Sequence, residues 1–116
     1  MITLQNISKH GVEEIKLIQE AAKNYPQIEA IYLFGSCAKG TDTENSDIDT
    51  LIIWNNFEDY KSEGLNIASF VETIFLKKAF EWDRLFLNSV EELEKKDYGV
   101  YTSIKELNCV IYKKEI

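Results

Sequence analysis

The sequence predicts an α/β (α+β) protein in which a small β-sheet is flanked by helices. Short apolar runs rich in β-branched and aromatic residues are typical of buried strands. They alternate with longer segments whose apolar residues recur at helical spacing. The size also fits, because 116 residues with 45% hydrophobic and 28% charged side chains suffice for one globular domain but not for two. We therefore expect residues 1–116 to form a single domain.

The first predicted element is an amphipathic helix over residues 9–24. Pro26 follows it and cannot continue a helix. The apolar positions that give the helix one face for burial are Val12, Ile15, Ile18 and Ala22.

Two core strands are predicted next, over residues 28–34 and 48–54. Each is short and apolar and is bounded by turn chemistry. Between them, Ser36 can open a short helix over residues 37–39. Residues 41–45 are turn formers, so we expect a polar connection there.

A second amphipathic helix is predicted over residues 60–78, followed by a third strand over residues 81–87. The apolar stripe of the helix consists of Ile67, Phe70, Val71 and Ile74. The polar residues on or near its other face are Glu63, Asn66 and Lys77. Alternation along the strand places Asp83, Leu85 and Leu87 on one face and Trp82, Arg84 and Phe86 on the other.

The C-terminal part of the sequence predicts two short helices and an extended end. Ser89 and Glu92 fit a capping box that opens a helix to Lys96. A last helix is expected over residues 98–107. Residues 109–112 read as a brief strand or an extended tail.

Charge and cysteine content argue against several classes of function. A net charge of −7 disfavours broad binding to nucleic-acid phosphates, which needs clustered Lys and Arg. Two cysteines, Cys37 and Cys109, and one histidine are too few for a disulfide framework or a zinc site. The sequence shows neither a bilayer-spanning apolar run nor a signal-peptide pattern, so we expect a cytoplasmic protein with no membrane partner.

Asp47 and Asp49 lie two residues apart at the start of the second strand, so their side chains project from the same face. Two such carboxylates repel each other unless a cation or a donor sits between them. Mg²⁺ suits the arrangement, because it takes oxygen ligands and is usually held by one or two carboxylates plus substrate phosphates.

Gly35 and Ser36 supply the phosphate side of such a site. A glycine at a strand end lets the backbone approach an anion closely, and a helix that begins at Ser36 points its first N–H groups outward. Lys39 adds a positive charge nearby. The stretch therefore predicts a cradle for a nucleoside triphosphate and its metal.

Gly-Ser, ten intervening residues and Asp-x-Asp, set between two predicted strands, resemble the signature of the DNA polymerase β-like nucleotidyltransferases. At this chain length the likeness is to the minimal nucleotidyltransferase group, the antitoxin partners of HEPN-type toxins. It covers residues 28–87 for the site and extends into the helices beyond. The resemblance implies a small mixed β-sheet flanked by helices, the polymerase β-like nucleotidyltransferase fold.

The resemblance also implies the remaining site residue. The family places a third acid on a strand that follows a helix, and this position falls on Asp83. Asp47, Asp49 and Asp83 would then be catalytic and would hold two Mg²⁺ ions. Two alternatives stay open: Asp83 could pair with a neighbouring basic residue as a structural ion pair, and Glu81 could be the acid instead.

The function implied by the resemblance is transfer of AMP from ATP to a tyrosine hydroxyl of a HEPN-type toxin, which makes the chain an antitoxin. One alternative is nucleotidyl transfer to a small hydroxyl compound, and another is an antitoxin that acts by binding alone. The presence of all three acids favours catalysis. The family also often has a basic residue at the position of Cys37, where this chain has none.

Overall fold

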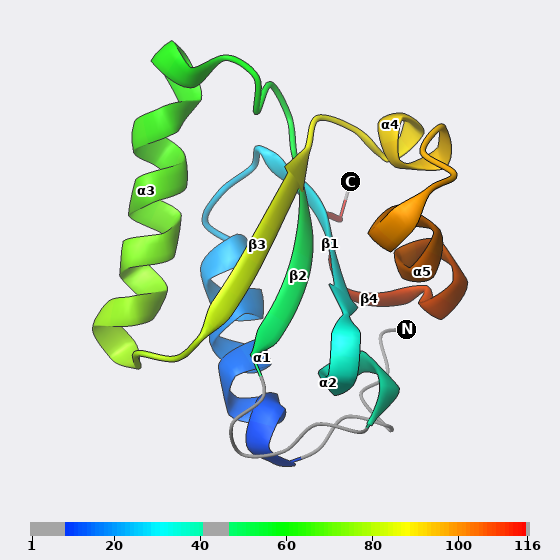
Figure 1. Ribbon diagram of the computed structural model, residues 1–116. Helices are drawn as coiled ribbons and strands as arrows, with labels where there is room; N and C mark the ends of the chain where they lie inside the picture. Colours follow the sequence, from blue (N-terminus) through cyan, green and yellow to red (C-terminus); the bar gives the residue numbers. More distant parts are fainter. Residues whose placement is uncertain (1–8, 41–46, 116) are drawn as a thin grey trace.

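The computed structural model describes residues 9–40 and 47–115 (Figure 1). The predicted polar turn at residues 41–45 lies outside this part of the chain. The described elements, in order, are α1 (Lys9–Ala22), β1 (Ile28–Phe34), α2 (Gly35–Lys39), β2 (Ile48–Trp54), α3 (Tyr60–Lys77), β3 (Trp82–Leu87), α4 (Val90–Glu94), α5 (Gly99–Leu107) and β4 (Cys109–Lys113).

The described strands form one mixed sheet in the order β3-β2-β1-β4. β1 lies between β2 and β4 and is antiparallel to both, whereas β2 and β3 are parallel. Parallel neighbours need a crossover connection, and α3 supplies it. This sheet with its flanking helices confirms the predicted fold class.

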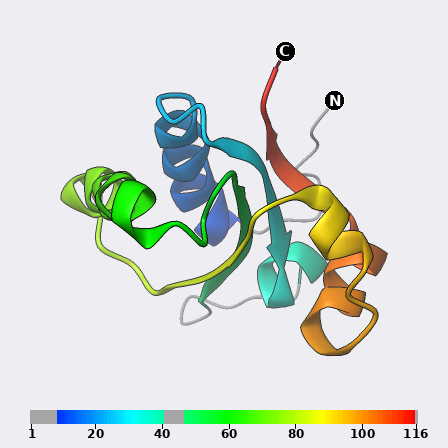
Figure 2. The ribbon, with the colours of Figure 1, turned by 90° about the horizontal axis from the view of Figure 1, so that it is seen from above.

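Helices cover both faces of the sheet. Figure 2 shows α1 and α3 together on one side, with α4 and α5 on the other. α2 directly continues β1, at the end of the sheet where β2 and β3 begin (Figure 1). The connections at this end carry the predicted site residues.

The main core lies between the sheet and the α1–α3 layer. α1 contributes Ile15, Ile18 and Ala22, all fully buried, as its helical spacing predicts. α3 contributes Phe70 and Ile74 from its apolar stripe. Each fully buried side chain of this size contributes about 1.5–3 kcal/mol, so this layer holds the sheet in place.

β2 is buried on both faces and divides the two cores. Ile52 and Trp54 pack in the α1–α3 core, whereas Leu51 and Ile53 pack in the second core with Leu93 of α4. Because side chains alternate along a strand, the odd-numbered residues of β2 face α4 and α5.

The predicted strands over residues 28–34 and 48–54 are confirmed at both ends, but the first helix ends at Ala22 instead of residue 24. The amide of Asn24 donates to the carbonyl of Ala21, and that of Tyr25 donates to Ala22, both at 3.1 Å. These bonds to the third residue back tighten the chain into a turn before Pro26.

The later element boundaries differ from the prediction by one or two residues. α3 ends at Lys77, because Lys78 is extended (φ −162°, ψ 128°). α4 ends at Glu94 instead of residue 96, and α5 begins at Gly99, whose φ is +54°. Residues 109–113 form a strand, so the chain does not leave the sheet as a tail.

The predicted capping box at the start of α4 is present in a modified form, because the Glu92 side chain bonds to the amide that precedes the N-cap residue Ser89. The hydroxyl oxygen of Ser89 accepts a hydrogen bond from the amide of Glu92 at 3.1 Å. Glu92 reaches back to the amide of Asn88 at 3.0 Å. The two bonds satisfy backbone donors that a helix start would otherwise leave unpaired.

The prediction for Glu63 was wrong, because this residue does not lie on the polar face of α3. It is 8% exposed, and its Oε1 accepts a hydrogen bond of 2.8 Å from the indole Nε1 of Trp54. Helical periodicity alone missed this, since a buried indole N–H at the end of β2 needs a partner and only α3 supplies it.

Neither Cys37, which is buried, nor Cys109, which is half-buried, forms a disulfide. This agrees with the expectation that they form no disulfide framework. Among the described helices, none combines the length and the apolar character that a bilayer crossing requires.

Candidate active site

The parallel register of β2 and β3 sets two carboxylates side by side. Asp49 is the register partner of Asp83, and Ile48 precedes it as the partner of Trp82. Since Ile48 and Trp82 are buried in the α1–α3 core, Asp49 and Asp83 project from the opposite face. The two acids therefore share the face that α4 and α5 partly cover.

The carboxyl groups of Asp49 and Asp83 lie within hydrogen-bonding reach of each other. Burial, this hydrogen bond and the negative charges of Asp83 and Asp47 together raise the pKa of Asp49 from 3.8 to about 6. A pKa raised by neighbouring acids marks a place where negative charge is crowded. A bound cation would relieve the crowding.

Asp47 lies directly before β2 and is half-buried. Its charge contributes to the raised pKa of Asp49, which places it within electrostatic reach of the pair. The Sγ of buried Cys37 donates a long hydrogen bond of 3.6 Å to the Asp47 carbonyl. This bond links α2 to the chain that enters β2.

Gly35 packs against the side chain of Asp49. Its φ is +74°, a conformation that L-residues with side chains rarely adopt. A Cβ at this position would collide with the Oδ2 atom of Asp49. Glycine is therefore required here by both the backbone and the acid, and the phosphate loop expected from the sequence touches the carboxylate pair.

The other two predicted phosphate ligands lie on α2, which begins at Gly35 and is thus longer than the expected helix over residues 37–39. Ser36 is half-buried in its first turn. Lys39 is its exposed last residue, followed by Gly40, whose φ is +73°. No described hydrogen bond or ion pair ties Lys39 to the acids, so only the nearness of α2 to the acids connects it with the site.

The two alternatives for the third acid can be compared with the geometry. Asp83 is exposed and takes part in none of the ion pairs found within residues 9–40 and 47–115. Glu81 precedes β3, is exposed, and uses its backbone carbonyl to accept the amide of Ile48 at 3.0 Å. Register and hydrogen bonding therefore favour Asp83 as the partner of Asp49.

The donor set suits a hard divalent cation. Carboxylate oxygens are the ligands that Mg²⁺ prefers, and one or two of them usually act together with substrate phosphates. As the side chains stand, no three acidic, histidine or cysteine residues of the described chain lie close enough to hold an ion by themselves. Asp49 and Asp83 meet the requirement for a site that a triphosphate completes.

Two residues behind the acids were missed by the sequence interpretation. Thr50 is fully buried in the apolar run of β2, and its hydroxyl is the partner of the Trp82 indole N–H. The signal was a hydroxyl side chain at the start of the apolar run of β2, directly after Asp49.

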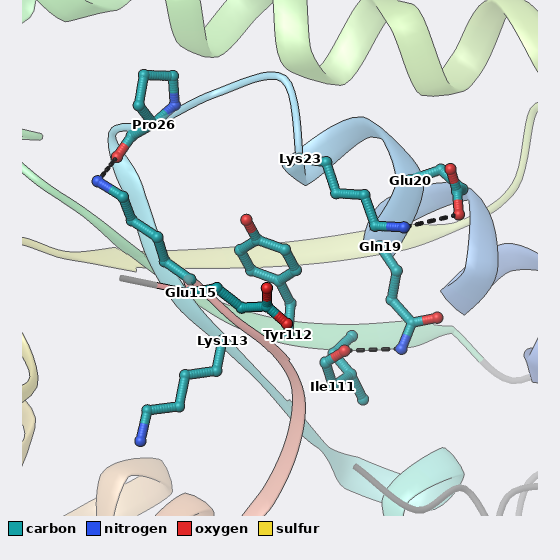
Figure 3. Close-up of a pocket in the computed structure, with 9 residues that line it drawn as sticks. Gln19, Glu20, Lys23, Pro26, Ile111, Tyr112, Lys113 and Glu115 are labelled. Carbon is teal, nitrogen blue, oxygen red and sulfur yellow. Dashed lines mark hydrogen bonds and ion pairs between the residues drawn. The ribbon is translucent and has the colours of Figure 1, made fainter. Parts of the chain in front are cut away.

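A surface hollow of about 670 Å³ lies away from the acids, between α1 and β4 (Figure 3). Its charged groups are partly engaged: Lys23 pairs with Glu20 at 3.2 Å, and Lys114 donates to the Pro26 carbonyl at 2.9 Å. No predicted site residue lines it.

Comparisons with known proteins bear on the family of the chain. The sequence profile of the family described as polymerase beta, nucleotidyltransferase matches residues 16–115. Over 42 residues the chain is 43% identical to the protein adenylyltransferase MntA of Shewanella oneidensis. That match covers 36% of this chain and 30% of MntA, so it spans less than a third of the relative's length.

A solved structure from Sulfolobus solfataricus, described as a candidate nucleotidyltransferase, is also similar. The likeness covers 78% of this chain and 84% of the other, with 23% identity and a TM-score of 0.45. A score at this level supports no conclusion about the activity of the chain.

Proposed function

The chain belongs to the polymerase beta nucleotidyltransferase family, and on this premise we propose that it transfers AMP from ATP to a tyrosine hydroxyl of a HEPN-type toxin, acting as its antitoxin. The observation that carries the proposal is the Asp49–Asp83 carboxyl pair with Gly35 packed against it. Paired acids beside a glycine that opens a helix suit a metal-bound triphosphate.

Asp47, Asp49 and Asp83 would hold two Mg²⁺ ions. When bound, these ions would supply charge neutralisation for the triphosphate and lower the pKa of the attacking hydroxyl. The fit rests on carboxyl groups that lie close together, since burial, the hydrogen bond to Asp83 and the charges of Asp83 and Asp47 together raise the pKa of Asp49.

The triphosphate would lie along the start of α2. Gly35 lets the start of α2 lie against the Asp49 carboxylate, Ser36 in the first turn would contact the phosphates, and Lys39 adds positive charge at the helix end. Orientation of the α-phosphorus by these groups would supply much of the rate enhancement, because phosphoryl-type transfer depends on positioning and electrostatics more than on covalent catalysis.

The chemical step is an in-line displacement. The acceptor hydroxyl oxygen forms a bond to the α-phosphorus, and the bond between that phosphorus and the oxygen bridging to the β-phosphate breaks. Pyrophosphate leaves with the electron pair of the broken bond. The hydroxyl proton passes to the Asp83 carboxylate, which is exposed and can return it to solvent.

The choice of a protein acceptor is supported by the similarity to MntA, which is described as a protein adenylyltransferase. The tyrosine of a HEPN-type toxin as the acceptor follows from the sequence resemblance to the minimal nucleotidyltransferase group. The net charge of −7 also suits a protein or small-molecule acceptor better than a nucleic-acid acceptor.

The test is incubation of the purified protein with α-phosphate-labelled ATP, Mg²⁺ and the protein encoded beside it, followed by intact mass of both chains. We expect one or more AMP units on the partner. Asp47→Asn combined with Asp49→Asn should abolish the gain, whereas Glu72→Gln on the exposed surface of α3 should not.

Two results would overturn parts of the proposal. Unchanged masses in a tight complex of the two proteins would identify an antitoxin that acts by binding alone. AMP on a small hydroxyl compound, with no protein labelled, would keep the nucleotidyl transfer and replace the acceptor.

A further inference from the structure

A buried hydrogen bond joins β2 to β3 directly behind the acid pair. The indole Nε1 of Trp82 donates to the hydroxyl oxygen of Thr50 at 2.8 Å. The same hydroxyl lies 3.5 Å from the Asp83 carbonyl and can donate a hydrogen bond to it. Thr50 is fully buried and Trp82 is 5% exposed, so water does not compete for this bond.

The bond connects the residues that flank the two acids in sequence. Trp82 precedes Asp83, and Thr50 follows Asp49, while Asp49 and Asp83 are themselves register partners. The Thr50–Trp82 hydrogen bond therefore joins β2 and β3 on one face of the sheet, at the same position along the strands where Asp49 and Asp83 meet on the other face. Any slip of β3 along β2 would break it and would also move Asp83 away from Asp49.

Surrounding side chains hold the ring of Trp82 in place. If Thr50 moved, the indole N–H could therefore not move with it and the hydrogen bond would break. Phe80 stacks on its ring at 5.9 Å, and the Arg84 guanidinium lies 4.8 Å from its centroid. Phe70 and Phe75 of α3 meet it edge to face at 5.9 and 5.8 Å. Through this ring α3 is connected to the strand that carries Asp83.

We propose that Thr50 and Trp82 are positioning residues for nucleotidyl transfer, holding Asp49 and Asp83 opposite each other through their buried hydrogen bond. This role rests on the proposed function. Neither residue touches the reacting atoms, because both lie on the far face of the sheet. Loss of the Thr50 hydroxyl leaves a buried indole N–H without a partner, and the ring or the strand must shift to satisfy it.

The test compares two substitutions at one position. Thr50→Val keeps the shape of the side chain and removes the hydroxyl, whereas Thr50→Ser keeps the hydroxyl and removes a buried methyl group. Thr73→Val is the matched control, since the Thr73 hydroxyl bonds only to the Ser69 carbonyl within α3, at 2.8 Å. Kinetics with ATP, Mn²⁺ affinity without nucleotide, the melting temperature and the Trp82 indole N–H resonance are measured for each.

In Thr50→Val we expect the indole resonance to shift, Mn²⁺ to bind more weakly, and kcat to fall about ten- to a hundredfold with a smaller change in the KM for ATP. Thr50→Ser should keep all of these within about twofold, although it loses packing and melts lower. Thr73→Val should match the wild type. If kcat depends on the presence of the Thr50 hydroxyl and not on the melting temperature, the loss of activity is due to lost positioning and not to lost stability.

Two results would overturn the inference, and they can be told apart. Equal kcat and Mn²⁺ affinity in Thr50→Val and Thr50→Ser, in a chain whose wild type is active, would remove the positioning role alone. A wild-type chain that neither transfers AMP nor binds Mn²⁺ would remove the proposed function and this role with it.

Discussion

Asp49 is the residue whose surroundings depart most clearly from those of an ordinary surface acid. It meets Asp83 by hydrogen bond, lies within reach of the Asp47 charge, and has the Cα of Gly35 against its carboxylate. These neighbours are polar or lack a side chain. The site is therefore costly to the folded protein without a cation, and single-residue changes should separate stability from activity.

The raised pKa of Asp49 predicts a particular dependence of stability on pH. The folded protein keeps this proton up to about pH 6, whereas the unfolded chain loses it near its ordinary value of 3.8. The folded state thus binds more protons between about pH 4 and pH 6, and the free energy of unfolding falls as the pH rises through that range. Asp49→Asn should remove this fall and stabilise the protein at neutral pH.

The gain at neutral pH should be on the order of 1 kcal/mol, because solvent screens a carboxyl that is only partly buried. Urea unfolding of wild type and variant at about pH 4.5 and pH 7, without metal or nucleotide, measures it. A variant that is less stable at pH 7, or that keeps the full pH dependence, would show that the acids do not repel each other as the geometry indicates.

Gly35→Ala should abolish nucleotidyl transfer and destabilise the protein. The new Cβ would strike the Asp49 carboxylate, and a φ of +74° costs alanine about 1–3 kcal/mol in strain. Displacement of the acid should lower kcat at least about a hundredfold. Transfer assays and urea unfolding of the purified variant measure both effects.

Gly64 provides the matched control for this change. It lies within α3, and a Cβ there meets nothing within 4 Å. Gly64→Ala should stabilise the helix by about 0.5–1 kcal/mol and leave kcat unchanged. Equal kinetics in the two alanine variants would contradict a role for Gly35 at the acid pair.

At the scale of elements, β2 is anchored to its surroundings by a buried indole hydrogen bond at each end. At the site end, Trp82 of β3 bonds to Thr50. At the far end, Trp54 bonds to Glu63 of α3. The two bonds have similar chemistry and the same length of 2.8 Å, but only the first adjoins the acids.

Glu63→Leu should therefore cost stability without costing activity. It leaves the Trp54 indole N–H buried without its acceptor, which lowers the free energy of unfolding by about 1–3 kcal/mol. The kcat of the folded fraction should stay at the wild-type value. A large fall in kcat at a temperature well below the melting point would show that the far end of β2 is also coupled to the site.

The elements also show which parts of the fold are readable from sequence. The shared face predicted for Asp47 and Asp49 rests on strand alternation, which is a local property, but Asp47 lies before the first residue of β2. The pairing of β3 with β2 sets Asp83 beside Asp49. This pairing is a long-range contact that no local sequence pattern predicts, and only the family resemblance indicated it. The Thr50–Trp82 bond spans 32 residues and could not be predicted from either strand alone.

Helix ends and the buried carboxylate of Glu63 escaped prediction for a related reason. Whether α1 continues past Ala22 depends on whether each following amide bonds to the carbonyl three or four residues back. The spacing of apolar residues is the same in both cases and does not predict which bond forms. Glu63 looks like a surface residue by periodicity, but the Trp54 indole requires an acceptor at its position.

At the scale of the whole molecule, the two faces of the sheet have different roles. The α1–α3 layer buries the larger core and holds the back of the sheet, while the acids occupy the other face beside α2. The chain also carries a net charge of −7, so the acid pair lies in a protein that attracts cations overall.

Divalent metal should therefore stabilise the folded molecule through linkage. Free Mg²⁺ at about ten times its dissociation constant adds about 1.4 kcal/mol, which raises the melting temperature by about 5 °C for a chain of this size. The Asp47→Asn, Asp49→Asn double variant should show no rise. A rise of equal size in that variant would place the metal elsewhere.

The most direct test of the account compares Asp83→Asn with Glu81→Gln in the transfer of labelled AMP at saturating ATP and Mg²⁺. Asp83 lies opposite Asp49 in the register, whereas Glu81 precedes the strand. We predict that Asp83→Asn loses at least about a thousandfold in kcat, as expected for a group acting at the reacting atoms, and that Glu81→Gln retains wild-type activity. Retained transfer in Asp83→Asn, with loss in Glu81→Gln, would contradict the site built on the β2–β3 register.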